Sequence, residues 1–227
     1  MTQKEILRKV ISSMETELRL FDFVASFKDQ GFIRNTEDST FFFQLLIYNR
    51  TIIKTSVKGF LIEPFIWVNV KEVETYYKEI TLNKYLQRDI NFVTLGNSLA
   101  DLLANSDGIY KTRNNSLDLL IFNDSDVYYV TEQLIKKFKE VALPYCLQNS
   151  SVAAVDTLAN TRPQEYKVNL VNDNYRIVKG IIAAKLNGNP RLEDLIKIYN
   201  RQLVERNMPD DTKEEMRRLK EILPTMK

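Results

Sequence analysis

Three residues in the second half of the chain have types and spacing that suit metal-dependent phosphodiester cleavage. Asp156 lies upstream of Glu165-x-Lys167, and the stretch Val168–Val171 that follows has the pattern of a strand. Many magnesium-dependent nucleases hold a metal ion with carboxylates and stabilise the developing charge with a lysine. Glu-x-Lys is also common by chance, and Asp156 lies in a stretch of helical pattern. A solvated linker is therefore the simpler interpretation, and the nuclease is the alternative.

A second acidic pair, Asp124-x-Asp126, offers oxygen ligands of the kind that divalent cations bind. The pair follows Asn123 at the start of an amphipathic stretch. Carboxylates at such a position favour the N-terminal end of the helix dipole. We therefore predict that these residues cap a helix.

The composition excludes several other chemistries. The chain has no histidine and only one cysteine, Cys146, so imidazole-based triads, histidine metal sites and thiolate cages are ruled out. Its six glycines never fall into a GxGxxG or Walker A spacing. We predict no cofactor and no bound metal, and we expect Cys146 to be a small buried hydrophobic residue.

Length and charge point to an ordinary globular protein. The 227 residues are 44% hydrophobic, and 32 basic against 30 acidic residues give a formal charge of +2. This balance does not support a nucleic-acid partner. No apolar run approaches the roughly 20 residues that span a bilayer, so no membrane partner is expected. A single cysteine suits a reducing compartment, and we predict a cytoplasmic location.

A candidate partner-binding patch lies in the most strand-like part of the chain. Tyr48, Arg50, Glu63 and Trp67 combine aromatic and charged groups on what would be the more polar face of a sheet. The alternative is that a helix covers Trp67, because large aromatic residues are mostly buried.

The sheet that would carry this patch runs from Phe41 to Val70, where β-branched and aromatic residues dominate. The pattern predicts an antiparallel meander of about three strands, with a tight turn at Lys58-Gly59. Pro64 cannot donate to a ladder, so we expect a bulge or a switch of edge there. Leu117–Phe122 is predicted to add another strand.

Helical periodicity surrounds the sheet and predicts an α+β fold. Apolar residues at steps of three and four indicate one long helix from Gln3 to Gln30, ended by Gly31. Another regular stripe runs from Val127 to Tyr145, with Pro144 expected to kink or end it. We predict an α+β domain over residues 1–162. A helical bundle over residues 163–227 is predicted to pack on it and to contribute to the binding surface.

The order of elements resembles a known group of proteins. A long N-terminal helix ending in Gly31-Phe32, a polar turn, and Thr40-Phe41-Phe42-Phe43 opening a meander are similar to a family of uncharacterised bacterial domains of unknown function. Members of this family are often compared with toxin-immunity proteins. The resemblance covers about Leu18 to Leu158, and it implies a compact α+β domain that binds something and does no chemistry. It carries over no functional residues.

Two hypotheses follow from these patterns. The first is a non-enzymatic cytoplasmic protein, immunity-like in type, that binds another protein. The alternative is a metal-dependent nuclease that uses Asp156, Glu165 and Lys167.

Overall fold

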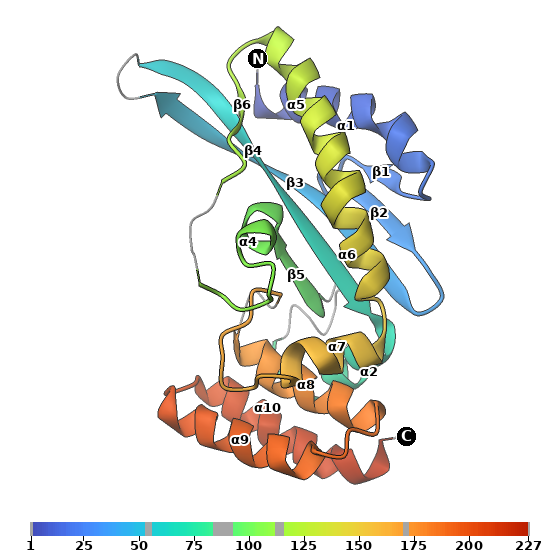
Figure 1. Cartoon of the computed structure of the whole chain (residues 1–227), viewed down its shortest axis with the longest axis vertical. Coiled ribbons are helices and arrows are strands. Elements are labelled where there is room, and N and C mark those ends of the chain that lie inside the picture. Colours follow the sequence, from blue (N-terminus) through green and yellow to red (C-terminus); the bar gives the residue numbers. More distant parts are fainter. Residues whose placement is uncertain (1, 53–55, 84–92, 112–115, 170–172, 227) are drawn as a thin grey trace.

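The computed structural model of the protein describes residues 2–52, 56–83, 93–111, 116–169 and 173–226. Over these residues the protein has an α+β fold built on one antiparallel six-stranded sheet (Figure 1). The sheet runs in the order β1-β2-β3-β4, and both β5 and β6 pair with the far edge of β4. The strands are β1 (Val24–Ser26), β2 (Gly31–Asn35), β3 (Ser39–Ile52), β4 (Val57–Val70), β5 (Leu95–Ser98) and β6 (Leu119–Ile121). The predicted antiparallel sheet is confirmed, including the strand expected within Leu117–Phe122.

The centre of the sheet is a hairpin of two long strands. β3 and β4 pair without interruption from Ser39↔Val70 to Ile52↔Val57. The predicted three-strand meander was therefore wrong in one respect, since Lys58 and Gly59 lie within β4, opposite Thr51 and Arg50. A glycine fits inside this strand because Phe122 packs against it, and a Cβ there would lie 2.4 Å from the Phe122 ring.

Pro64 lies inside β4 without a bulge, in direct register with Leu45. β6 pairs with Phe60–Ile62 and β5 pairs with Phe65–Val68, so Pro64 falls between the two. The missing N–H therefore faces a position where no strand pairs with β4. The predicted bulge or switch of edge is therefore absent, because no ladder hydrogen bond is lost at this position.

The N-terminal helix is shorter than its apolar periodicity predicted. α1 (Gln3–Arg19) ends well before Gln30, and the chain then turns through Asp22, whose φ is 63°, into β1. β1 pairs with β2 in a small hairpin that uses Val24 as a strand residue. The apolar spacing was misleading here, because Val24 is exposed in β1 and Phe23 enters the core instead.

Helices α1 and α5 lie side by side, and α5 is followed by α6 (Figure 1). Both helices contribute to the apolar core beneath the sheet. The ring of Phe138 lies 5.0 Å from that of Phe23 and 5.3 Å from that of Phe43, which joins the helical layer to β3. The helices are α1 (Gln3–Arg19), α2 (Lys71–Ile80), α4 (Leu99–Ala104), α5 (Asp124–Lys137), α6 (Leu143–Gln148), α7 (Val152–Asn160), α8 (Asp173–Leu186), α9 (Leu192–Glu205) and α10 (Asp210–Ile222).

The predicted cap of the α5 segment is confirmed, and the chain does not leave the helical conformation at Pro144. Asn123 accepts from the backbone of Ser125, and the Asp126 carboxylate accepts from the Asn123 N–H at 3.0 Å, as expected for a capping box. A π-helical turn, Phe138–Ala142, precedes α6. Pro144 stands at the start of α6, and the wider turn accommodates a residue that cannot donate an N–H.

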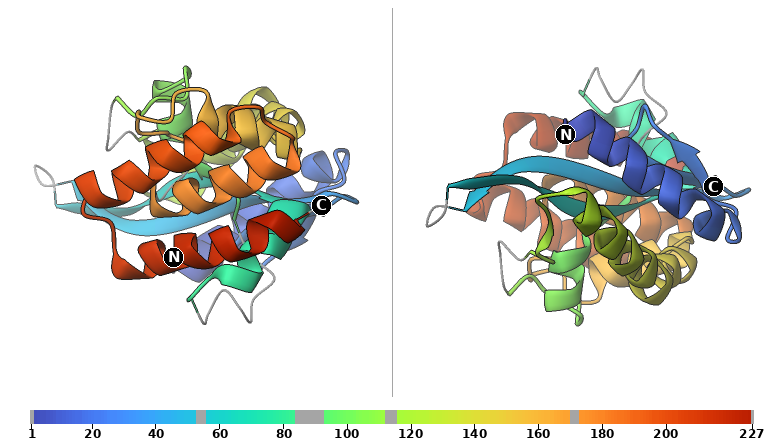
Figure 2. Two further views of the ribbon diagram at one scale, coloured as in Figure 1. Left: turned by 90° about the horizontal axis from the view of Figure 1, so that it is seen from below. Right: turned by 90° about the horizontal axis from the view of Figure 1, so that it is seen from above.

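The remaining helices, α7 to α10, gather across the end of the sheet opposite to the N-terminus (Figures 1 and 2). Gly188 follows α8 with a φ of 62°, the left-handed conformation in which a glycine commonly ends a helix. The apolar core is continuous across residue 163, since α8 buries Ile177, Val178 and Ile181 together with residues of the sheet. A 3₁₀ turn, Leu223–Thr225, ends the described chain.

A buried ion pair fastens α8 to α2. The Lys179 ammonium donates to both oxygens of Glu74, at 2.8 and 3.0 Å, and to the backbone oxygen of Val93 at 2.7 Å. Both charged side chains are almost fully buried. Thr94 donates to Glu74, and the Tyr77 ring lies 4.4 Å from the ammonium. The pair is therefore hydrogen-bonded on all sides, as a buried charge requires.

A second buried carboxylate fastens α10 to the same helix. Glu215 accepts from the Thr81 hydroxyl at 2.7 Å, from the Leu82 N–H at 3.0 Å and from the Tyr77 hydroxyl at 3.2 Å. Burial raises the pKa of Tyr77, so this phenol remains a hydrogen-bond donor. Buried polar contacts thus fasten both α8 and α10 to α2 and the residues directly after it.

We predict that Phe43→Ala lowers the free energy of unfolding by about 3–5 kcal/mol, because the buried ring leaves a cavity among aromatic neighbours. Phe42→Ala is the matched control, since Phe42 lies on the opposite, half-exposed face of the same strand. It should cost clearly less. Equal costs in urea unfolding would show that the core does not lie on the Phe43 face.

Removing one member of the buried pair should cost more than removing both. Lys179→Met leaves Glu74 buried without a counter-charge and should lower the free energy of unfolding by about 3–5 kcal/mol. The double variant Glu74→Met/Lys179→Met should be more stable than the single one. Chemical denaturation of both proteins measures this. A double variant that loses the sum of the two single costs would contradict the account.

Candidate functional site

The register of β3 and β4 places the four residues of the predicted partner-binding patch on one face of the sheet. Trp67 lies opposite Phe42, and Arg50 lies opposite Gly59. Residues directly opposite each other in an antiparallel pair share a face, and alternate residues follow on that face. Tyr48, Arg50, Glu63 and Trp67 therefore point to the same side, away from the face that carries Phe43. We call this surface the ribbon face.

The lower part of the ribbon face is aromatic. Trp67 and Phe65 stack with ring centroids 5.2 Å apart and an angle of 17° between the planes. The Trp67 indole N–H donates to the Gln44 side chain at 3.0 Å. Both rings and Phe42 are half-buried, so they present apolar area without being enclosed. Rigid aromatic groups of this kind are the residues that protein interfaces favour.

The upper part of the ribbon face is charged. Tyr48 is 41% exposed, and the adjacent Arg50 is exposed. Burial raises the pKa of the Glu63 carboxyl, Asp101 raises it further, and Arg50 lowers it. Burial also raises the pKa of Tyr48, with Glu63 adding to the effect. These side chains are thus close enough to influence one another, and they offer donors and acceptors beside an aromatic surface.

Asp156, the first residue of the nuclease alternative, is held in a different place. Its buried carboxylate accepts from the side-chain amides of Asn160 at 2.6 Å, Asn187 at 2.7 Å and Asn189 at 2.9 Å. Asn160 in turn accepts from the Tyr199 hydroxyl at 2.7 Å. Asp156 therefore ties α7 to the turn between α8 and α9, which is a structural role.

Glu165 and Lys167 lie near each other but not in a site with Asp156. Glu165 pairs with Arg162 at 3.4 Å, and Lys167 is only 7% exposed. Burial lowers the pKa of Lys167, and Arg162 and Arg176 lower it further. No hydrogen bond or ion pair joins Asp156 to Glu165 or Lys167 within the described residues. This arrangement gives no support to the nuclease hypothesis. That hypothesis stays an untested prediction.

The stretch predicted as a strand after Lys167 is only partly described. Lys167 forms a single antiparallel bridge with Ile109, and residues 170 and 171 lie outside the described residues.

Among the described residues, no group of three or more Cys, Asp or Glu side chains lies close enough to hold a metal ion. Throughout the described ranges of the chain, no helix is both long and apolar enough to cross a membrane.

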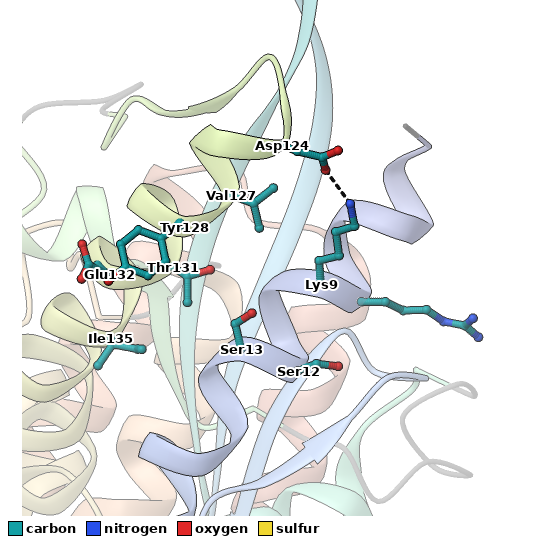
Figure 3. Close-up of a pocket in the computed structure, with 10 residues that line it drawn as sticks. Lys9, Ser12, Ser13, Asp124, Val127, Tyr128, Thr131, Glu132 and Ile135 are labelled. Carbon is teal, nitrogen blue, oxygen red and sulfur yellow. Dashed lines mark hydrogen bonds and ion pairs between the residues drawn. The ribbon is translucent and has the colours of Figure 1, made fainter.

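A groove between α1 and α5 was not predicted (Figure 3). It has a volume of about 860 Å³, and the Lys9–Asp124 ion pair crosses one end of it. Thr131 points into the groove from α5, and its buried hydroxyl has no hydrogen-bond partner among the described residues. Basic Arg8 and acidic Glu132 both line the groove, so its charge does not select a ligand. No motif marks this groove, because residues more than 100 positions apart form it.

No family model, curated protein or solved structure matches the chain.

The raised pKa of Glu63 predicts a pH dependence. The folded state binds a proton at Glu63 more tightly than the unfolded state, so Glu63 destabilises the fold as pH rises above its ordinary pKa of 4.5. Glu63→Gln should therefore stabilise the protein near neutral pH relative to wild type. The difference should shrink in acid, below the ordinary pKa. Urea unfolding at both pH values tests this, and a pH-independent difference would contradict it.

Proposed function

We propose that this protein binds another protein through the ribbon face of the β3–β4 hairpin and does no chemistry. The observation that carries the proposal is the convergence of Tyr48, Arg50, Glu63 and Trp67 on one half-exposed sheet face. A stacked aromatic pair with charged neighbours has the composition of an interface centre and its rim.

The position of the hairpin supports this proposal. In Figures 1 and 2 the described ends of β3 and β4 extend past the helices. Asn49 and Thr51, on the face opposite to Tyr48, are exposed as well, so the end of the hairpin is open on both sides. A partner can therefore reach Tyr48 and Arg50 at the end of the ribbon face without any rearrangement of the helices.

The chemistry of the other candidate residues favours binding over catalysis. The Asp156 carboxylate accepts hydrogen bonds from three asparagine side-chain amides. Cys146 is fully buried, and burial raises the pKa of its thiol. A buried thiol with a raised pKa is a poor nucleophile. A cytoplasmic location and an immunity-like role remain predictions that agree with this proposal.

Affinity capture followed by mass spectrometry tests the proposal. Wild-type protein and the variant Tyr48→Ala/Arg50→Glu should differ in the proteins that they retain from cells of the native host. Both side chains are exposed, so the variant should fold normally, which a thermal unfolding curve checks. We expect the variant to lose the specific partner.

The matched control is Tyr128→Ala/Tyr129→Ala. These tyrosines are 71% and 61% exposed on α5, so the control removes more exposed aromatic area than the loss of Tyr48 does, at a place away from the ribbon face. The control should keep the partner. Retention by the ribbon-face variant, or loss by the control alone, would place the binding surface elsewhere.

A further inference from the structure

The outer edge of β3 is open beyond the start of β2. β2 pairs with β3 only as far as Gly31↔Gln44, and the last contact is the Leu45 N–H, which donates to the Gln30 oxygen at 2.8 Å. β3 continues to Ile52, and no described strand pairs with this part of its outer edge. The open stretch is Leu46–Ile52, and it is long for an unprotected edge.

The direction of the free backbone groups follows from the ladder. The Leu45 N–H points outward to Gln30, so the N–H and C=O groups of Ile47, Asn49 and Thr51 also point outward. Pro64 agrees with this assignment, because it lies opposite Leu45 and needs no N–H toward β3. The open edge therefore offers three donors and three acceptors in strand geometry.

A basic pocket lies beside this edge. It has a volume of about 460 Å³ between α1, the turn that leads into β2, and Ile47 of β3. Lys4, Arg8 and Lys28 line it together with the apolar Phe27, and no acidic residue lines it. All three basic side chains are exposed, and none forms an ion pair with a described residue. The pocket thus combines apolar area with uncompensated positive charge.

We propose that an extended acidic segment of another protein adds to the open edge of β3 as an extra strand. Its backbone would bond to Ile47, Asn49 and Thr51, and its acidic side chains on the α1 side would meet Lys4, Arg8 and Lys28. Strand addition of this kind takes affinity from the backbone and specificity from pockets for alternate side chains. This inference rests on the proposed function, since it specifies the chemistry of the polypeptide partner.

Charge selects this occupant over a second copy of the chain. Edge-to-edge pairing of two copies would bring the lysines and arginine of both pockets together along one ladder. Like charges placed opposite each other in a sheet are destabilising. An acidic strand instead neutralises the pocket. The open stretch accommodates a segment of about six residues at roughly 3.3 Å per residue.

A synthetic peptide tests the proposal directly. The probe is a fluorescently labelled peptide of about eight residues that alternates glutamate and valine, and the control probe alternates lysine and valine. Fluorescence anisotropy should show saturable binding of the acidic peptide alone, weakening with salt. Equal binding of both probes, or no binding of the acidic probe at millimolar protein, would overturn the proposal.

Two substitutions at one position separate the backbone from the side chain. Asn49→Pro removes an outward N–H and leaves the β3–β4 ladder intact, so peptide binding should fall by roughly tenfold or more. Asn49→Ala keeps the N–H and should bind as wild type. Circular dichroism confirms that both variants fold. Equal affinities of the two variants would show that the edge is not used.

Charge reversal tests the pocket. Lys4→Glu/Lys28→Glu should abolish binding of the acidic probe, whereas Lys197→Glu/Arg201→Glu on α9 makes the same change in net charge and should leave it unchanged. If both pairs weaken binding equally, the attraction is non-specific and the lysines serve only to block edge pairing. Self-association of wild type that Asn49→Pro abolishes would make a second copy the occupant and also overturn the proposal.

The two proposals fail separately. Tyr48→Ala/Arg50→Glu changes the ribbon face, and Asn49→Pro changes the edge. Partner capture that survives the first change but not the second would reject the ribbon face and keep the edge. Capture that survives Asn49→Pro, with no peptide binding, would reject the edge and keep the ribbon face.

Discussion

The uninterrupted ladder between β3 and β4 is the constraint on which the rest of the molecule depends. Because successive side chains alternate between faces, one register puts Phe41, Phe43 and Leu45 into the core and leaves Tyr48 and Trp67 on the other side. The same register directs alternate backbone groups of β3 outward. A shift of the register by one residue would exchange the two faces of the sheet. The backbone groups that now point outward along β3 would then point toward β4 and bond to it. The buried core, the ribbon face and the open edge therefore all depend on this one register.

The C-terminal helices share the apolar core of the sheet, and buried charges fasten them to α2. Lys179 reaches Glu74, and Glu215 reaches Tyr77 and Thr81, so α8 and α10 are both fastened to α2 directly after β4. Broken pairs of this kind are expensive, which favours one arrangement of the helices. The helices close one end of the sheet, and the hairpin leaves the other end free. Both proposed binding surfaces therefore lie on the hairpin and not on the C-terminal helices.

Local patterns predicted the parts of the structure that local chemistry determines. The strand pattern within Phe41–Val70 and the helix cap at Asn123 both follow from neighbouring residues. The helix predicted to Gln30 was wrong because the chain turns at Asp22 into β1, where Val24 is exposed and Phe23 enters the core. The turn predicted at Lys58-Gly59 was wrong because Phe122, distant in sequence, packs against Gly59. For the candidate site, alternation alone placed Tyr48, Arg50, Glu63 and Trp67 on one face. The basic pocket could not be predicted, because it needs α1 and the turn before Gly31 to lie beside Ile47.

Residue-resolved amide hydrogen exchange in the free protein tests the central claim most directly. We predict an alternation along the end of β3. The amides of Leu46, Tyr48 and Arg50 bond to β4 and should exchange slowly, while those of Ile47, Asn49 and Thr51 face outward and should exchange fast. Uniformly slow exchange would show that something already covers the edge. Slow exchange at the odd positions and fast exchange at the even ones would reverse the register, and with it both the ribbon face and the open edge.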